Sequence, residues 1–401
     1  MFLEGVRVLE ITTFLSGPFA AQLLADLGAE VVKVEARGGD FARSLPPHFV
    51  GEDSAYFHAV NRSKRSLQID LKDERGRALF EDLAGASDVV LEAFRPGVMD
   101  RLGLGLDRLR AANPRLVTCS LSGFGSNSPH RDVPAFDAMI QAWSGGMSLT
   151  GHPGAPPARM GIPIGDLAAG MYAALGITGA LARRAVTGEG DHVDVAMYDA
   201  QIALIGYQAA NYLVSGEVPG PQGSGHVSMP TYRAFLCGDG QYVMVTANTE
   251  RMWQGLCRAL GLDALTEDPR FETNATRLQN AEELWALLEP AFAARDSQDV
   301  LKALRAESVP VGPVNDVGQA LADEQVAARN MLVRIADVEG NALQVPGNPI
   351  KAGGVRPDAA MTAAPRLGAD TSAVLHEFLG LGADDVAQLQ ASGAVGPYGA
   401  D

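Results

Sequence analysis

The first 35 residues carry the pattern of a β-strand, an α-helix and a second β-strand, and this pattern restricts the fold of the chain most. Residues 6–11 and 31–34 are rich in Val, Leu and Ile, as is typical of strands. Between them, the turn Gly17-Pro18 precedes an apolar helical stripe that stops at Gly28. Similar strand-like runs at 89–91, 116–119 and 193–195 alternate with helical patterns such as residues 75–83. Because strands that alternate with helices form parallel sheets covered by those helices, we predict an α/β fold.

The character of the chain changes near residue 218, where a Pro/Gly-rich loop begins. Residues 232–236 and 242–246, joined by Asp239-Gly240, have the pattern of a β-hairpin. Helical patterns follow at 250–260, 281–294 and 298–306, and then the Pro/Gly loop 309–313. We therefore predict a large domain over residues 1–200, a linker over 201–224, a small α+β domain over 225–315, and a segment, 316–401, that returns to the large domain.

Charge and cysteine content disfavour several classes of partner. The chain of 401 residues has a formal net charge of −16, whereas nucleic acid or an anionic membrane would require a basic face. Its three cysteines show no paired spacing, which fits buried thiols in a reducing compartment. We see no secretory signal at the N-terminus, and the uncharged helical stretch of residues 167–182 is shorter than the about 20 residues that cross a bilayer. We expect a cytoplasmic protein with no nucleic acid and no membrane among its partners.

The common catalytic motifs are missing from the sequence. The first strand–helix turn has only Gly17 of the G-x-G-x-x-G pattern, which disfavours a nicotinamide cofactor, so we interpret Glu35 as a solvated strand end. No serine lies in G-x-S-x-G, and neither the phosphate-binding G-x-x-x-x-G-K-[ST] nor H-E-x-x-H occurs. The seven histidines are scattered, so we expect no metal site.

One carboxylate, Asp166, lies between a Gly/Pro-rich approach and an uncharged stretch with helical character. Asp is a favoured N-cap residue because its side chain accepts an unpaired N–H of the first helical turn. The same position suits a nucleophile, because a helix N-terminus stabilises an anion and offers N–H groups to an oxyanion. Gly161, Gly165 and Gly170 carry no Cβ and would let a bulky substrate approach. The residues alone leave both interpretations open.

Basic residues next to glycine turns are frequent near the front of the chain. Exposed Lys and Arg are common on protein surfaces, so each alone indicates little, but together they suit a phosphate-bearing ligand. The candidate anion contacts are Arg37, the Asn-Arg-Ser-Lys-Arg run at 61–65, Lys72, Arg95 and Arg101.

Short motifs in a fixed order connect the chain to a known family. They lie at residues 8–18, 27–35, 61–66, 69–72, 94–97, 122–125, 161–170, 230–235, 268–271 and 310–315. This ordered set resembles the class III CoA-transferase family, which includes formyl-CoA:oxalate and carnitine CoA-transferases and, more distantly, α-methylacyl-CoA racemase.

The resemblance implies a Rossmann-like large domain with a parallel sheet, a smaller domain, and two chains interlocked as a homodimer. It places the family's catalytic aspartate on Asp166. It also implies an enzyme that moves CoA from an acyl-CoA donor to a carboxylic acid acceptor, with the CoA thioester as substrate and no permanently bound cofactor. On this mechanism Asp166 forms a mixed anhydride and then an aspartyl-CoA thioester. The implied CoA contacts are Leu15, Ser16, Arg37, Lys72, Ala93, Phe94, Arg101 and Leu102.

The chain departs from the family pattern around residue 136. Pro134 and Phe136 stand where formyl-CoA transferases carry Lys and Tyr, which leaves the acid substrates open, while Asp137 keeps an acid beside the site. The racemase branch uses a Gly-His-Asp run for α-proton transfer, and here the run is Ala135-Phe136-Asp137. A transferase is therefore favoured over the alternative, an acyl-CoA racemase or epimerase.

A mixed anhydride reacts readily with water, so the site needs a cover. The segment 220–226 is our candidate lid, with Gly223 and Gly225 supplying backbone freedom next to His226. The other interpretation of this segment is a plain interdomain linker.

Overall fold

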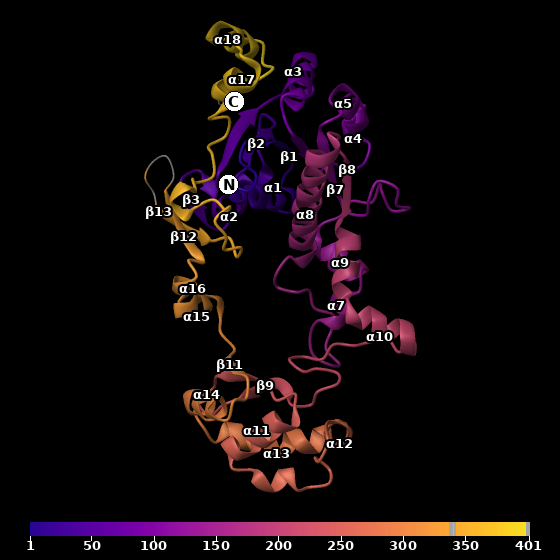
Figure 1. The fold of residues 1–401 in the computed structure, drawn as a ribbon, viewed down its shortest axis with the longest axis vertical. Helices are drawn as coiled ribbons and strands as arrows, with labels where there is room; N and C mark the ends of the chain where they lie inside the picture. The colour runs from indigo at the N-terminus through magenta and orange to yellow at the C-terminus, as the bar shows by residue number, and fades with distance from the viewer. Residues whose placement is uncertain (337–339, 341, 398–401) are drawn as a thin grey trace. The chain divides into compact units, whose positions relative to one another are not determined.

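The computed structural model describes residues 1–336, 340 and 342–397. The chain divides into two compact units, and Figure 1 labels most of their helices and strands. The large unit contains Met1–Gly146, Arg159–Gly216 and Gln325–Asp401. The small unit contains Met147–Ala158 and Glu217–Glu324.

A parallel sheet organises the large unit. In the described part of the chain it has six strands in the order β5-β2-β1-β6-β7-β8. In chain order this arrangement is 3-2-1-4-5-6, the order of the doubly wound Rossmann fold. The strands are β1 (Arg7–Ile11), β2 (Glu30–Glu35), β5 (Lys64–Gln68), β6 (Val89–Glu92), β7 (Val117–Ser122) and β8 (His192–Ala196). The predicted α/β fold with a parallel sheet is confirmed, although the pattern of residues 64–68 did not predict a strand.

Helices cover both faces of the sheet, because successive strand residues point to opposite sides. Val8 of β1 packs into one core with α1 (Ser16–Asp26) and α8 (Ile164–Thr187). Leu9 packs into the other core with α3 (Glu74–Gly85), α5 (Leu106–Ala112), α17 (Thr371–Leu379) and α18 (Ala383–Ala391). Each fully buried Val or Leu stabilises the unit by about 1.5–3 kcal/mol. Burial on both faces explains why apolar residues of β1, β2 and β6 stand next to one another in sequence, as in Val31-Val32 and Val89-Val90-Leu91, and do not strictly alternate with polar ones.

Shorter elements complete the large unit. They are η1 (Phe41–Ser44), β3 (Phe49–Val50), β4 (Asp53–Ser54), α2 (Ala55–Asn61), α4 (Val98–Arg101), α6 (Asp137–Trp143), α9 (Met197–Ile205), α10 (Tyr207–Ser215), β12 (Leu332–Ala336), β13 (Ala342–Pro346) and η3 (Asp358–Ala360). Two further helices, α7 (Gly146–Leu149) and α16 (Glu324–Ala328), lie at the unit boundaries. Strands β12 and β13 form a separate antiparallel pair.

Two expectations about this unit differ from the structure. Much of the predicted linker, residues 201–224, is helical, because the Pro/Gly-rich composition begins only after α10 and the preceding apolar residues continue α9 and α10. Helix α8 is 24 residues long, beyond the predicted uncharged run, and by length and composition alone it could cross a membrane. Half of its most apolar stretch is buried in the structure, and a core helix passes the same test.

The small unit is built on the predicted hairpin. Strands β9 (Tyr232–Leu236) and β10 (Tyr242–Thr246) pair antiparallel, and β11 (Val311–Pro313), interpreted from sequence as a loop, adds to β10. Phe235, Trp253 and Phe292 are buried in its core. Its helices are α11 (Glu250–Leu260), η2 (Asp263–Thr266), α12 (Asn274–Gln279), α13 (Ala281–Ala293), α14 (Ser297–Ala306) and α15 (Val317–Leu321).

Candidate active site

Two adjoining cavities lie where the strand order of the large sheet reverses, next to the carboxyl ends of β1 and β6. Ligands of open α/β sheets bind at this switch point. The first, the strand-end cavity, has a volume of about 230 Å³ and is lined by Ile11–Thr13, Val34–Ala36, Gly39, Asp40, Ile69–Lys72, Ala93, Phe94 and Leu102. The second, the Asp166 cavity, has a volume of about 680 Å³. Thr13, Ala93 and Phe94 line both, so one ligand can extend from the first into the second.

Asp166 lines the second cavity from the first turn of α8. It is the third residue of the helix, the N-cap position is Pro163, and no side chain at that position caps the helix. The interpretation of Asp166 as the N-cap is therefore wrong. Its carboxylate accepts a hydrogen bond from the Ser16 hydroxyl. Burial raises the pKa of Asp166 from an ordinary 3.8 to about 7, the charge of Asp137 adds to the rise, and the Ser16 hydrogen bond opposes it.

Asp137, at the start of α6, accepts a hydrogen bond from a backbone N–H in the first turn of α8, as an N-cap side chain of that helix would have done. Its Oδ1 accepts the Gly165 N–H at 2.8 Å, and its Oδ2 accepts the Gln141 side-chain amide at 2.7 Å. Gln141 in turn accepts the Met160 N–H at 2.8 Å, which ties the approach to α8 onto α6. Both oxygens of Asp137 accept hydrogen bonds within the protein, so it positions α8 and places a negative charge near Asp166. Asp137 also lines the cavity, and its predicted contact with the substrate stays a prediction.

A close approach of two helices brings Ser16 to Asp166. A Cβ added at Gly170 would lie 2.7 Å from the Ser16 carbonyl oxygen, so only glycine lets α8 pack this tightly against the start of α1. Likewise, a Cβ at Gly165 would meet Asp137 Oδ1 at 3.1 Å. These two glycines serve helix packing, whereas Gly161 has open space beside it and lines the cavity.

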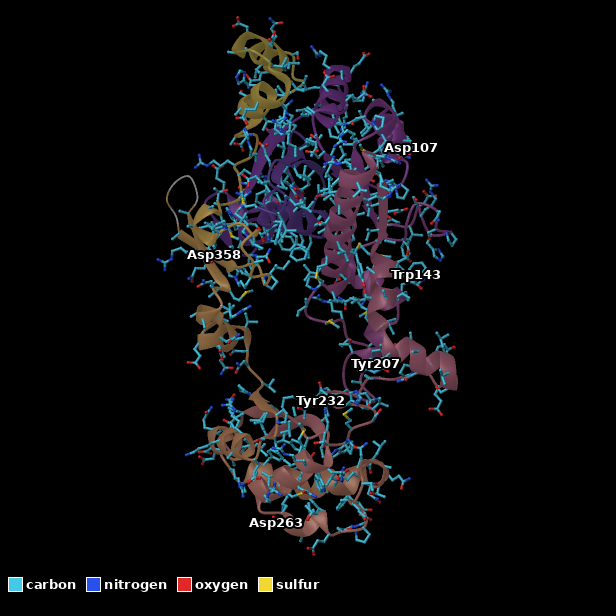
Figure 2. All side chains as sticks on the ribbon, in the orientation of Figure 1. Asp107, Trp143, Tyr207, Tyr232, Asp263 and Asp358 are labelled. Carbon is cyan, nitrogen blue, oxygen red and sulfur yellow. The ribbon has the colours of Figure 1, made fainter. Side chains whose placement is uncertain are left out.

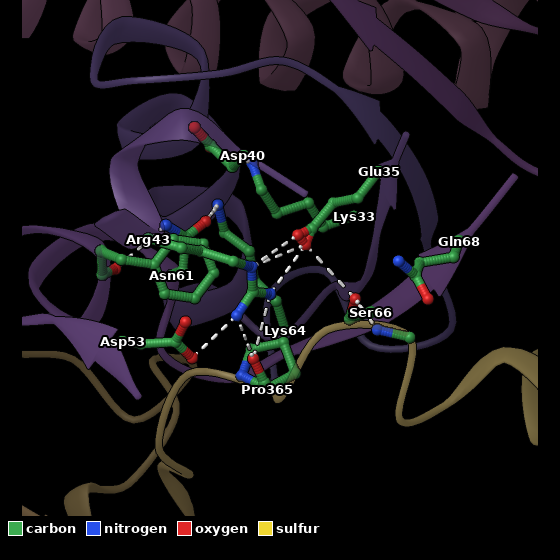
Figure 3. Close-up of polar contacts among 12 residues, drawn as sticks. Lys33, Glu35, Asp40, Arg43, Asp53, Asn61, Lys64, Ser66, Gln68 and Pro365 are labelled. Carbon is green, nitrogen blue, oxygen red and sulfur yellow. Dashed lines mark hydrogen bonds and ion pairs between the residues drawn. The ribbon is translucent and has the colours of Figure 1, made fainter. Parts of the chain in front are cut away.

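A buried network of charges joins β1, β2 and β5, and Figure 3 draws its members Lys33, Asp40 and Lys64 near the neighbouring pair of Glu35 and Arg43. Lys33 Nζ is 3.1 Å from Glu10 Oε1 and 2.9 Å from Asp40 Oδ2, and Lys64 Nζ is 2.8 Å from Glu10 Oε2. Burial opposes ionisation of Glu10, but the two lysines hold its pKa at about 2. Burial lowers the pKa of Lys64 to about 8 against the attraction of Glu10. Because buried charges persist only when they are paired, the ion pairs of this network compensate the burial of its members.

The network fixes the backbone of the loop that carries Ser16. Lys33 donates to the Thr12 carbonyl at 2.9 Å, and Lys64 donates to the Pro18 carbonyl at 2.8 Å. Asp40 Oδ1 accepts the Phe14 N–H at 3.1 Å, which supports the left-handed conformation of Phe14 at φ 65°. A non-glycine residue in that region costs about 1–3 kcal/mol and persists only where its surroundings determine it.

Two predictions about these charged residues are wrong. Glu35 is buried and paired with Arg43 at 2.7 Å rather than solvated. The cations of the run 61–65 are ion-paired within the large unit: Arg62 with Asp26, Lys64 with Glu10, and Arg65 with Glu30 and Glu377. They stabilise the fold and are not available as phosphate contacts.

Comparison with known proteins identifies the chain. The profile of CoA-transferase family III matches residues 3–371. The chain belongs to CoA-transferase family III. It is 39% identical to the acetyl-CoA:oxalate CoA-transferase of Acetobacter aceti over 377 residues, 94% of this chain and 95% of that protein. It is 37% identical to the succinate–glutarate CoA-transferase of Agrobacterium fabrum over 355 residues, 87% of this chain and 88% of that protein. The crystal structure of a CaiB/BaiF family protein from Brucella suis, 36% identical, superposes with a TM-score of 0.84 over 94% of this chain and 99% of that one.

The predicted resemblance is thus confirmed, and the protein is a family III CoA-transferase, whose substrates are CoA thioesters. The racemase alternative is not favoured, because the relatives are CoA-transferases. The cavity itself agrees with this, since no histidine lines it in the part of the chain that the structure describes. Phe136 is the residue before Asp137. Its ring packs against the ring of Phe14 in a T-shaped arrangement, with 5.7 Å between the ring centroids.

The structure brings most of the predicted CoA contacts of this CoA-transferase to the two cavities. Lys72, Ala93, Phe94 and Leu102 line the strand-end cavity, while Leu15 and Ser16 line the Asp166 cavity. Arg37 and Arg101 are exposed and line neither cavity. Arg37 directly follows the lining residue Ala36, and Arg101 directly precedes the lining residue Leu102. Their role as CoA contacts stays a prediction.

The predicted lid residues Gly223, Gly225 and His226 lie in the small unit. The Gly223 N–H donates to the Gly151 carbonyl at 2.8 Å, and the His226 ring stacks on Tyr232 at 5.4 Å. Gly223 has φ 59°, so it needs the backbone freedom that was expected of it. Closure over Asp166 stays a prediction.

Sequence reasoning missed three residues that line the Asp166 cavity: Tyr56, Arg131 and Arg159. Burial, followed by the charge of Asp166, raises the pKa of Tyr56 to about 12, so its phenol stays protonated at neutral pH. No local pattern distinguishes these residues, because a single Tyr or Arg has the same surroundings in sequence wherever the fold places it.

Proposed function

We propose that this CoA-transferase moves CoA from an acyl-CoA donor to a free carboxylic acid through covalent intermediates on Asp166. The observation that carries the proposal is the position of Asp166 in a cavity that continues into the strand-end cavity at the switch point of the sheet. CoA would lie along the shared wall at Ala93 and Phe94, with its thioester directed at Asp166.

The reaction has four steps that balance without any added reagent. The Asp166 carboxylate attacks the thioester carbonyl and expels CoA thiolate, which leaves an acyl-aspartyl anhydride. The thiolate attacks the aspartyl carbonyl and releases the donor acid, which leaves an aspartyl-CoA thioester. The acceptor carboxylate attacks this thioester to form a second anhydride, and the thiolate then takes the acceptor acyl group and regenerates Asp166.

The electrostatics support this role. A pKa of about 7 leaves Asp166 half ionised near neutral pH, and a partly desolvated carboxylate is a stronger nucleophile than one in water. The Gly165 N–H is taken by Asp137, so this amide cannot bind the oxyanion as the sequence interpretation expected. The protonated phenol of Tyr56 lines the same cavity and can donate to the oxyanion instead.

The relatives support a dicarboxylic acid as one of the two acids exchanged. Oxalate, succinate and glutarate appear in the names of the proteins from Acetobacter aceti and Agrobacterium fabrum, and all three acids carry two carboxylates. The departure at Pro134 and Phe136 makes the wall beside Asp166 apolar, which suits the carbon chain of such an acid.

Exposed apolar side chains support the homodimer. Leu175 on α8 and Leu213 and Val214 on α10 are each more than two-thirds exposed. Tyr207, at the start of α10, is also exposed (Figure 2). Apolar surface of this kind on a soluble chain marks an interaction site. Light scattering on the purified protein tests the expectation, and a monomer at micromolar concentration would contradict it.

Trapping the thioester tests the mechanism. The protein is incubated with a panel of acyl-CoAs and free acids, and CoA exchange and a hydroxylamine-sensitive enzyme–CoA adduct are measured by mass spectrometry. We expect the adduct on Asp166 in the native protein and in Asp191→Asn, a matched change of an exposed aspartate paired with Arg183. We expect neither adduct nor exchange in Asp166→Asn, and normal exchange in that variant would refute the proposal.

The lid has its own test. At Gly225 an added Cβ meets only the Gln222 carbonyl, at 3.1 Å, whereas at Gly223 it would meet the His152 ring at 2.8 Å and impose strain at positive φ. Gly225→Ala is therefore the cleaner variant. We expect more thioester hydrolysis per CoA transferred, and an unchanged ratio would exclude a covering role for this segment.

A further inference from the structure

Three arginines line the Asp166 cavity. Of the described residues that line it, Arg95, Arg131 and Arg159 are basic, and Asp137 and Asp166 are the acidic ones. Both oxygens of Asp137 are engaged by Gly165 and Gln141, so the arginines outnumber the available carboxylates. In a chain with a net charge of −16, this local excess of positive charge indicates an anionic ligand.

Arg131 and Arg159 are weakly engaged by the protein. Arg131 Nε lies 3.9 Å from Asp132 Oδ1, and Arg159 Nη1 donates to the Met160 carbonyl at 3.4 Å. By contrast, the fold-stabilising Arg43 makes three hydrogen bonds to Glu35 at 2.7–3.2 Å. A guanidinium presents five N–H donors, so most of the donors of Arg131 and Arg159 remain for a ligand in the described part of the chain.

Their place in the cavity separates them from the CoA path. The wall shared with the strand-end cavity is made of Thr13, Ala93 and Phe94, and Arg95 follows that wall directly. Arg131 and Arg159 come from segments that line the Asp166 cavity alone. Phe136, from the same stretch as Arg131, contributes apolar surface beside them. A ligand group at these two arginines would therefore lie away from the shared wall along which the proposed function places CoA.

We propose that Arg131 and Arg159 bind the second, non-reacting carboxylate of a dicarboxylic acid while its first carboxylate reacts at Asp166, and that they thereby select dicarboxylic over monocarboxylic acids. This proposal rests on the proposed function of Asp166. Guanidinium groups pair with carboxylates through two parallel hydrogen bonds, which fixes the direction of the acid as well as its affinity. A charge-assisted hydrogen bond of this kind corresponds to about a 10- to 150-fold preference.

The test compares two acids of equal chain length, glutarate and pentanoate, as acceptors with acetyl-CoA as donor. The variants are Arg131→Gln, Arg159→Gln and Arg159→Lys, which keeps the charge but not the paired donors. Arg110→Gln is the matched control, because Arg110 lies on α5 outside both cavities and is also 3.9 Å from its acidic neighbour, Asp107. Single-turnover formation of the enzyme–CoA adduct from acetyl-CoA is measured for every variant.

We expect the native enzyme and Arg110→Gln to prefer glutarate in kcat/KM. In Arg131→Gln and Arg159→Gln we expect KM for glutarate to rise about 10- to 150-fold, with pentanoate and adduct formation unchanged, and a smaller rise in Arg159→Lys. A native enzyme without the preference, or variants that keep it, would overturn the proposal while normal adduct formation leaves the role of Asp166 intact. Absence of the adduct in the native enzyme would instead overturn the proposed function.

Discussion

Replacing Asp166 by Asn is expected to abolish CoA transfer and at the same time to stabilise the protein at neutral and alkaline pH. Burial and Asp137 raise the pKa of Asp166 from 3.8 to about 7, so the folded state favours the protonated carboxyl more than the unfolded chain does. The neutral amide of Asn has a similar shape, can still accept the Ser16 hydrogen bond, and has no charge to desolvate.

The sign and size of the effect follow from proton linkage. Below about pH 4 the carboxyl of Asp166 is protonated in both the folded and the unfolded state, so it does not lower the free energy of unfolding. As the pH rises from about 4 to about 7, the unfolded chain releases this proton while the folded protein keeps it. The free energy of unfolding of the native protein therefore falls by about 1.4 kcal/mol per pH unit relative to that of the variant. Above about pH 7 the loss is complete, at about 4 kcal/mol. Solvent reaches part of the side chain, so we expect about half of this value.

Calorimetry at pH 5 and pH 8 measures the effect. Between these conditions the stabilisation by Asp166→Asn should grow by about 1–2 kcal/mol, which corresponds in a chain of 401 residues to a rise of about 1–3 °C in the Tm difference. Asp191→Asn, an exposed change, should show no such growth. An equal Tm difference at both pH values, or a variant less stable than the native protein at pH 8, would refute the assignment of a raised pKa to Asp166.

Three further predictions concern the same region. Adduct formation should rise with pH through about 7, because Asp166 must be ionised to attack, and Ser16→Ala should move this midpoint to higher pH by removing the hydrogen bond that favours the ion. Asp137→Asn should move the midpoint to lower pH by removing a negative charge, and should lower the Tm by weakening the helix cap. Lys64→Met should destabilise the fold by about 3–5 kcal/mol in urea unfolding, because it leaves Glu10 buried with one cation fewer.

The pH-dependence predictions and the prediction for Lys64→Met are refuted by different results. A pH–rate midpoint that stays in place in both Ser16→Ala and Asp137→Asn would show that another group controls the pH dependence. Lys302→Met, on the exposed face of α14, should leave urea unfolding unchanged. A Lys64→Met protein as stable as this control would show that the buried network contributes no net stability.

Much of the secondary structure follows from local patterns. Strands β9 and β10 and helix α11 occupy the residues predicted for them, because the alternation of apolar residues and the Asp239-Gly240 turn are contained within a few residues. Strand β5 was missed because four of its five residues are polar or charged, and its lysine and serine are buried by partners far away in the chain, Glu10 and Glu35. Periodicity reports which side chains are apolar, and it fails where a strand buries charge.

The sequence by itself determined the α/β class, the hairpin of the small unit, and, through an ordered set of motifs, the CoA-transferase family with Asp166 as its candidate nucleophile. The tertiary structure alone decided what surrounds that carboxylate. Asp137 holds the first turn of α8, Ser16 reaches Asp166 because Gly170 lets two helices touch, and Glu35 is paired rather than solvated. The physical reason is that capping, ion pairing and desolvation depend on groups that are distant in sequence, and the order of the strands determines which of them meet.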